Sequence, residues 1–158
     1  VESEVGMGSI FKFTIPLQKS LEEVPRQTAS QNNNIPTLNT SVLIVEDDEV
    51  NLTYLQEIIQ PTGAHILAVK SGRIALEIFR ENPKIGVILL DLKLPDANGL
   101  DLIKQFKSLS PSVHIIIQSA YATHEDVLIG FDSGCDVYLT KPVSETELFS
   151  AISKILEK

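Results

Sequence analysis

From Ser41 onward the chain alternates between two apolar patterns. Short runs in which nearly every residue is apolar predict strands buried on both faces of a sheet. Between these runs, apolar residues spaced three or four positions apart predict amphipathic helices. The predicted strands are Val42–Val45, Ile66–Val69, Val87–Leu90, Val113–Ile117 and Val137–Leu139.

Capping and turn residues mark where the predicted helices begin and end. Pro61 and Gly63 end the first helix, and Ser71 and Thr123 are placed to cap the second and fourth. The predicted helices cover Val50 to Gln60, the residues after Ser71 through Phe79, the residues after Asn98-Gly99 to Leu109, Thr123 to about Gly134, and Ser144 to Leu156. Five strand–helix units in succession predict an α/β fold, in which helices cover both faces of one parallel sheet and the crossovers are right-handed.

The first forty residues follow a different pattern. Gly6-Met7-Gly8 predicts a turn, and apolar residues at alternate positions from Phe11 to Leu17 predict a strand after it. Residues 18–40 are rich in Gln, Asn, Ser, Thr, Glu and Pro, a composition that buries too little apolar surface to order itself. We therefore predict a short N-terminal segment over 1–17, a linker over 18–40 and an α/β domain over 41–158.

Composition and charge narrow the class of protein. Apolar residues make up 43% of the 158 positions, enough for a buried core, and no apolar run approaches the roughly 18 residues that cross a bilayer. The net charge of −8 argues against binding to a nucleic-acid backbone. The single cysteine, Cys135, excludes a disulfide within the chain and suits a reducing compartment. These features predict a cytoplasmic domain without nucleic-acid or membrane contact.

Chemically reactive side chains follow the predicted strands. Glu46, Asp47 and Asp48 come after the first strand, Asp91 after the third, Ser119 after the fourth and Lys141 after the fifth. In an open parallel sheet, ligands bind outside the carboxyl ends of the strands, so we expect these side chains to meet at one edge. Carboxylates that meet repel one another, and a hard divalent cation such as Mg²⁺ relieves that repulsion.

The same set is complete for phosphoryl transfer to a carboxylate. Asp91 can attack phosphorus and form an aspartyl phosphate, a reaction that depends on positioning and positive charge more than on acid–base chemistry. Mg²⁺, Lys141 and the Ser119 hydroxyl can together contact the phosphoryl oxygens. Each residue alone has an ordinary structural explanation: Asp91 and Ser119 can cap a helix or a turn, and Lys141 can be a surface lysine. Their joint position at the strand ends favours the chemistry.

Four stretches of sequence strengthen this interpretation. They are Val42 to Asn51, Leu89 to Pro95, Gln118 to Tyr121 and Tyr138 to Pro142. In order and spacing they resemble the signature blocks of two-component receiver domains, over about Ser41 to Lys158. The resemblance implies a flavodoxin-like (βα)₅ fold, a doubly wound parallel sheet with strand order 2-1-3-4-5.

The resemblance also implies a role for each matching residue. Asp91 corresponds to the phosphoacceptor, Glu46 and Asp47 to the acidic pair that holds Mg²⁺, and the backbone carbonyl of Lys93 to the remaining protein ligand. Ser119 and Lys141 correspond to the pair that contacts the phosphoryl group. Tyr138 corresponds to a switch aromatic that turns inward when the serine moves, and Pro142 to a proline that follows a cis peptide bond.

Partners follow from the same resemblance. A receiver takes its phosphoryl group from the phosphohistidine of a histidine kinase and relays it to a histidine phosphotransfer domain. Phosphorylation switches the face formed by the fourth helix, fifth strand and fifth helix. Whether the chain dimerises through this face is left open by the sequence. Val1 to Leu17 resembles the last strand of a histidine kinase ATP-binding domain, so the parent is expected to be a bacterial hybrid histidine kinase, with or without a membrane anchor. The chain lacks the other kinase elements, and we do not expect it to be a kinase by itself.

Some points stay open at the level of sequence. Asp48 is a third acid beside the expected pair, which leaves open which of them touch the metal. Lys93 has a long basic side chain, and our hypothesis is that it controls, with Tyr121, the access of water to the aspartyl phosphate.

Three other classes of protein remain as alternatives. The first is a phosphatase of the haloacid dehalogenase type, although its Asp-x-Asp is missing. The second is a flavodoxin-like electron carrier, although its phosphate loop is missing. The third is a receiver that docks without being phosphorylated.

Overall fold

The computed structural model describes residues 2–4, 8–10, 12, 14, 35–121 and 123–157. The chain divides into two compact units, Val1–Asn32 and Asn33–Lys158. The larger unit carries every residue predicted for the site. No helix in the described ranges is both long and apolar enough to cross a bilayer.

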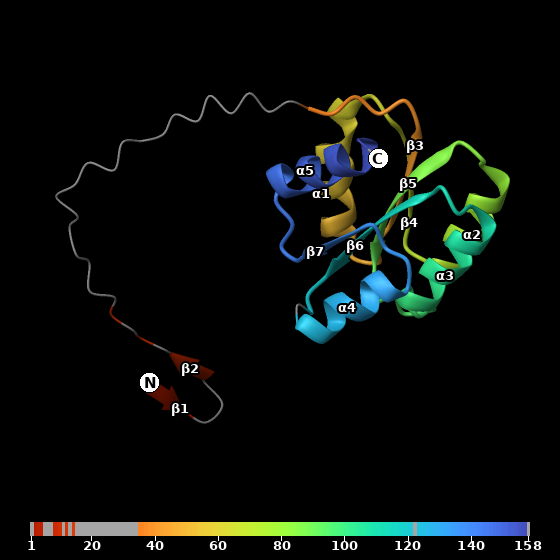
Figure 1. Cartoon of the computed structure of the whole chain (residues 1–158). Helices are drawn as coiled ribbons and strands as arrows, with labels where there is room; N and C mark the ends of the chain where they lie inside the picture. Colours follow the sequence, from red (N-terminus) through yellow and green to blue (C-terminus); the bar gives the residue numbers. More distant parts are fainter. Residues whose placement is uncertain are drawn as a thin grey trace. The chain divides into compact units, whose positions relative to one another are not determined.

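The larger unit is built around a five-stranded parallel sheet (Figure 1). Its strands are β3 (Ser41–Val45), β4 (His65–Val69), β5 (Ile85–Asp91), β6 (His114–Ser119) and β7 (Val137–Thr140). They lie in the order β4-β3-β5-β6-β7, and every neighbouring pair is parallel. Counted within this unit, the order is 2-1-3-4-5, which confirms the predicted fold class and topology.

Helices cover both faces of the sheet (Figure 1). They are α1 (Glu49–Ile59), followed by the short 3₁₀ helix η1 (Gln60–Thr62), α2 (Gly72–Glu81), α3 (Gly99–Leu109), α4 (His124–Asp132) and α5 (Glu145–Leu156). Helices α1 and α5 pack on one face, and α2 and α3 on the other. Helix α4 approaches β7 closely, because a Cβ atom added at Gly130 would lie only 2.8 Å from the Tyr138 ring.

Side-chain caps set where these helices begin. The Ser71 hydroxyl accepts a hydrogen bond from the Ile74 amide, and Thr123 forms a capping box with Asp126, so both predicted caps are confirmed. Ser144 likewise caps α5 and lies just before its first residue.

Strand β3 shows why the predicted strands are apolar at nearly every position. Val42 and Ile44 of β3 pack in the core beneath α1 and α5, whereas Leu43 and Val45 pack in the core beneath α2 and α3. Successive side chains of a strand point to opposite faces, and here both faces are covered. The strand therefore has no polar face.

The residues just before β3 belong to the packed unit, although the sequence placed them in the linker. Leu38 is only 3% exposed and joins the core beneath α1 and α5. Its amide donates to the Thr62 carbonyl at 3.0 Å, and the Thr40 hydroxyl donates to the Lys84 carbonyl at 2.7 Å. A single buried leucine in a polar stretch gives no periodic signal, so only packing reveals its role.

The N-terminal unit contains a short antiparallel pair, β1 (Glu2–Glu4) with β2 (Gly8–Ile10). The strand predicted from Phe11 to Leu17 is not found at Lys12 or Thr14, the two residues described there. A strand needs a partner, and the register of β1 ends with Glu2 opposite Ile10. The remaining positions of that predicted strand, and the predicted turn apart from Gly8, lie outside the described residues.

Candidate functional site

Four strand ends bring the predicted reactive residues together. Glu46 follows β3, Asp91 ends β5, Ser119 ends β6, and Lys141 follows β7. Because neighbouring strands are parallel and aligned, their carboxyl ends meet at one edge, as predicted. These four side chains line one cavity of about 260 Å³, together with Asp47, Asp48, Asn51, Lys93, Ala120 and Tyr121.

Three of the acids are placed to hold a cation. Glu46, Asp47 and Asp91 each offer a carboxylate oxygen, and these oxygens lie within 4.8 Å of one another. Glu46 and Asp91 are buried at 1% and 7% exposure, whereas Asp47 is exposed. Oxygen ligands at this spacing, partly open to solvent, fit Mg²⁺, which binds a few carboxylates and keeps several waters.

The acid nearest this group has a different role. The Asp48 carboxylate accepts a hydrogen bond from the Asn51 amide at 2.9 Å and is the N-cap of α1. It is absent from the group of converging oxygens. Asp48 therefore caps a helix, whereas Glu46 and Asp47 converge with Asp91. Which of these acids touch a bound metal stays a prediction.

Lys141 places a positive charge between two of the acids. Its Nζ donates to Glu46 Oε2 at 2.6 Å and to Asp91 Oδ2 at 2.5 Å. Burial alone would lower the pKa of Lys141, but the hydrogen bonds to Asp91 and Glu46 outweigh it and raise that pKa. Lys141 therefore stays charged between two carboxylates. The peptide bond from Lys141 to Pro142 is cis.

Glu46 is the acid most affected by its surroundings. Burial raises its pKa, and the nearby charge of Asp91 adds to that effect, while Lys141 and a 3.4 Å hydrogen bond from Asn51 Nδ2 oppose it. Asn51 was part of the matching sequence block but had no role in the sequence-based interpretation. Its position in the first turn of α1 explains the contact.

Tyr121 connects three of the predicted site residues. Its amide donates to the Ser119 hydroxyl at 3.1 Å, and its carbonyl accepts from the Tyr138 hydroxyl at 2.7 Å. Its own hydroxyl accepts from Lys93 Nζ at 2.9 Å, and this hydrogen bond raises the pKa of Lys93. Lys93 and Tyr121, which the sequence linked only as a hypothesis, are therefore in direct contact.

The ordinary explanations for these residues are partly correct. Ser119 does accept a bond within its own turn, as the capping interpretation expects. Asp91 does not cap a helix: Asn98 caps α3, while Asp91 Oδ1 accepts from the Lys93 amide at 2.8 Å. Lys141 is not a free surface lysine, because only 19% of its side chain is exposed.

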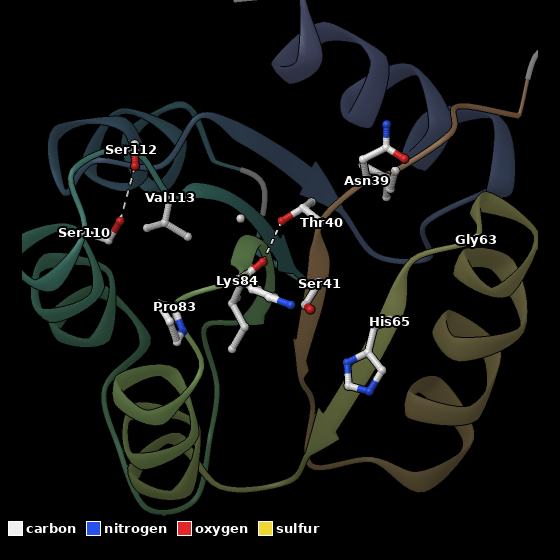
Figure 2. Close-up of a pocket in the computed structure, with 13 residues that line it drawn as sticks. Asn39, Thr40, Ser41, Gly63, His65, Pro83, Lys84, Ser110, Ser112 and Val113 are labelled. Carbon is white, nitrogen blue, oxygen red and sulfur yellow. Dashed lines mark hydrogen bonds between the residues drawn. The ribbon is translucent and has the colours of Figure 1, made fainter.

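A larger hollow of about 690 Å³ lies at the opposite edge of the sheet, at the amino ends of the strands (Figure 2). Its polar lining includes Thr40, Ser41, His65, Ser110 and Ser112, and no carboxylate side chain lines it in the part of the chain that the structure describes. Size alone would favour this hollow, but its described lining offers no carboxylate to hold a cation or to attack phosphorus. The smaller acid cavity is therefore the candidate site.

A comparison with protein families finds a match over most of the larger unit. The model described as "Response regulator receiver domain" matches residues 42–153. Solved structures agree. A two-component response regulator from Clostridium difficile has a TM-score of 0.71 and 25% identity, over 75% of this chain and 97% of that one. A BeF3-activated DrrB receiver domain has a TM-score of 0.68 and 26% identity, over 77% and 100%.

Curated proteins give similar matches. The aerobic respiration control sensor protein ArcB of Escherichia coli (strain K12) is 31% identical over 156 residues, covering 98% of this chain and 20% of that protein. The sensory transduction protein RegX3 of Mycolicibacterium smegmatis is 38% identical over 119 residues, covering 75% of this chain and 51% of that protein. The chain thus spans about a fifth of the first relative and half of the second.

Proposed function

The chain belongs to the response regulator receiver domain family, and on that premise we propose that it accepts a phosphoryl group on Asp91 in a two-component phosphorelay. The observation that carries the proposal is the surrounding of Asp91. This buried carboxylate ends a central strand and lies 2.5 Å from the Lys141 ammonium. Its oxygen lies close enough to those of Glu46 and Asp47 for the three to bind one cation. Membership of the family also disfavours the dehalogenase-type phosphatase and the flavodoxin-like carrier.

The transfer is a displacement at phosphorus. An Asp91 carboxylate oxygen forms a bond to phosphorus while the bond from phosphorus to the donor's histidine nitrogen breaks, and that nitrogen keeps the electron pair. Lys141 and the Ser119 hydroxyl donate hydrogen bonds to the phosphoryl oxygens. Glu46, Asp47, Asp91 and the Lys93 carbonyl would hold Mg²⁺, which would supply further positive charge for those oxygens.

Phosphorylation would be transmitted through Tyr121. The Ser119 hydroxyl now accepts a bond from the Tyr121 amide, and turning it toward a phosphoryl oxygen breaks that bond. The Tyr121 carbonyl in turn holds the Tyr138 hydroxyl. A shift of this segment therefore releases Tyr138 to turn inward and changes the face formed by α4, β7 and α5.

The longer protein is proposed to be a sensor. The match to a sensor protein extends over 98% of this chain, including its N-terminal unit, and that relative is about five times longer. We propose that residues 1–17 are the end of a histidine kinase ATP-binding domain and that 18–40 join it to the receiver. The receiver would be a cytoplasmic domain of a bacterial hybrid kinase. It would take its phosphoryl group from a phosphohistidine and pass it to a histidine phosphotransfer domain.

One experiment tests the central proposal. The chain is incubated with Mg²⁺ and acetyl phosphate, and the product is analysed by mass spectrometry. We expect a mass gain of one phosphoryl group that is stable in acid, labile in base, and mapped to Asp91. Asp91→Asn should abolish it, whereas Asp101→Asn, at an exposed acid on α3, should not.

Two results would overturn the proposal. Absence of any mass gain would favour the remaining alternative, a receiver that docks without being phosphorylated. An equal gain in Asp91→Asn would place the modification elsewhere.

A further inference from the structure

A groove distinct from the acid cavity lies between α1 and the segment that precedes α5. It has a volume of about 310 Å³ and is lined by Asn51, Tyr54 and Leu55 of α1, Gln118 of β6, and the segment Lys141–Val143. The Tyr54 hydroxyl donates to the Val143 carbonyl at 3.1 Å, which ties α1 to that segment. Asn51 and Lys141 line both hollows, so the groove and the acid cavity share a border.

One lining side chain has an unmet hydrogen bond. Gln118 is 2% exposed, and its Nε2 atom is buried with no acceptor among the described residues. Ile116, two positions earlier on the same face of β6, packs in the apolar core beneath α1 and α5. A buried amide donor without an acceptor destabilises the fold, which an apolar side chain of similar size would not do. Because Nε2 is buried as the side chain stands, an oxygen atom bound in the groove would satisfy this donor after the Gln118 amide turns toward it.

The surroundings select the kind of oxygen. Glu46, Asp47 and Asp91 lie across the shared border, and the Lys141 ammonium is already bonded to two of them. A negatively charged ligand would meet this surplus of negative charge, whereas a neutral carbonyl oxygen would not. The rest of the lining, which includes the Tyr54 ring and Leu55, offers apolar contact for a short hydrocarbon group.

We propose that this groove binds a small neutral amide or ketone. Its carbonyl oxygen accepts a hydrogen bond from Gln118 Nε2, and its hydrocarbon group packs against Tyr54 and Val143. The groove lies at the lower end of the range of about 300–1,000 Å³ that holds small ligands. It is roughly ten times the ~30 Å³ that one water occupies in the liquid, so a single water does not fill it. This binding does not depend on phosphorylation of Asp91 and goes beyond the phosphoacceptor function.

Propionamide is the probe, because it combines a neutral carbonyl with a two-carbon apolar group. It is titrated into the isotope-labelled chain, and the side-chain amide resonances of Gln118 are followed by NMR together with the methyl resonances of Leu55 and Val143. We expect all of them to shift along one saturating curve. Propionate has the same shape but a negative charge, and should shift them little at the same concentration.

Two variants make the test specific. Gln118→Met keeps the size of the side chain and removes the donor, so the Leu55 and Val143 methyl groups should no longer respond to propionamide, while thermal stability is kept or raised. Gln105→Met makes the same change on the exposed side of α3 and should bind propionamide as the parent does. The proposal is overturned if the Gln118 resonances stay still, which means that only water occupies the groove. It is also overturned if propionate binds equally well, or if Gln118→Met retains the response.

Discussion

Lys141 and Tyr121 organise the site at the scale of single residues. Glu46 and Asp91 are buried carboxylates that would repel each other, and the Lys141 ammonium lies between them at hydrogen-bonding distance from both. Removing one partner of such a group leaves an uncompensated buried charge, which is strongly unfavourable. Tyr121 adds no charge. Its contribution is geometric, because its amide, carbonyl and hydroxyl each fix a different neighbour.

The contact between Lys93 and Tyr121 leads to a prediction about the lifetime of the aspartyl phosphate. Both residues line the acid cavity, and the Lys93 ammonium lies 2.9 Å from the Tyr121 hydroxyl and 5.2 Å from the centre of its ring. Lys93→Ala should open this side of the cavity to water and speed hydrolysis several-fold. The rate is measured as loss of phosphoryl group from purified phosphorylated protein.

Tyr121→Phe breaks the same hydrogen bond and should shift the rate in the same direction. Lys104→Ala, at an exposed lysine of α3, serves as the control. An unchanged rate in Lys93→Ala would show that this side chain does not control access of water.

At the scale of elements, the loop from β5 to α3 is held firmly. Lys93 and Asn98 form an isolated bridge across it, and Gly99 packs so closely on Leu92 that an added Cβ would lie 2.6 Å from the Leu92 Cα. Asp96 fastens the loop to the start of α2. This rigidity matters for the site, because the same loop carries the Lys93 backbone beside Asp91.

Asp96 joins two elements through several hydrogen bonds, and its pH dependence can be predicted. Its carboxylate accepts from the Ser71 hydroxyl at 2.6 Å and from the Gly72 amide at 3.0 Å. These hydrogen bonds lower the pKa of Asp96 from 3.8 to about 2, and the bond from Ser71 has the largest effect. A lowered pKa means that the ionised form stabilises the fold: the effect is complete above about pH 4 and is lost as the pH falls toward 2.

We therefore expect Asp96→Ala to lower the urea midpoint at neutral pH. The gap between variant and parent should narrow as the pH falls from about 4 to about 2, the window set by the two pKa values. Asp101→Ala changes an exposed acid of α3 and should leave the midpoint nearly unchanged. A gap that stayed constant at low pH would show that ionisation of Asp96 is not what stabilises this contact.

The segment before β3 gives a second prediction at this scale. Leu38 is buried in the core, whereas Ile35 is 42% exposed. Leu38→Ala should therefore reduce the free energy of unfolding by about 2–5 kcal/mol, the usual cost of truncating a buried leucine. Ile35→Ala should have little effect. Both are measured by chemical denaturation, and equal effects would contradict the packing of Leu38 in the core.

At the scale of the whole molecule, the site is formed only when the fold is complete. Lys141 is separated from Asp91 by 50 positions and from Glu46 by 95, and each residue comes from a different strand end. An unfolded chain does not bring these groups together. Anything that binds them in the folded chain must therefore stabilise the entire domain.

Mg²⁺ should for this reason raise the melting temperature. At a concentration of 100 times its dissociation constant, one bound ion adds about 2.7 kcal/mol to the free energy of unfolding. Asp47→Asn should abolish most of the effect, because it removes one of the three converging oxygens. Asp48→Asn is the matched control: it is the same change one residue later, asparagine can still cap α1, and the effect should persist.

Thermal melts with MgCl₂ and with NaCl at equal ionic strength measure this difference. If the Mg²⁺ effect is lost in Asp48→Asn and retained in Asp47→Asn, Asp48 rather than Asp47 binds the ion, and the assignment made from the structure is wrong.

Within the larger unit, the sequence by itself determined the strands, the helices and the strand-end placement of the reactive residues. A strand buried on both faces must be apolar throughout, and parallel strands must present their carboxyl ends at one edge, so the apolar runs were sufficient to predict both. The resemblance to receivers then supplied the strand order. These predictions depend on periodicity and on short stretches of chain, which a sequence displays directly.

Only the tertiary structure decided how individual side chains are used. It showed that Asp48 caps α1 while Asp47 faces Asp91, that Leu38 is a core residue, and that Gln118 has a buried donor with no acceptor among the residues described. Each of these outcomes depends on the direction of one side chain and on neighbours distant in sequence. The physical reason is that periodicity fixes which face a residue lies on, while packing between elements fixes what that residue meets there.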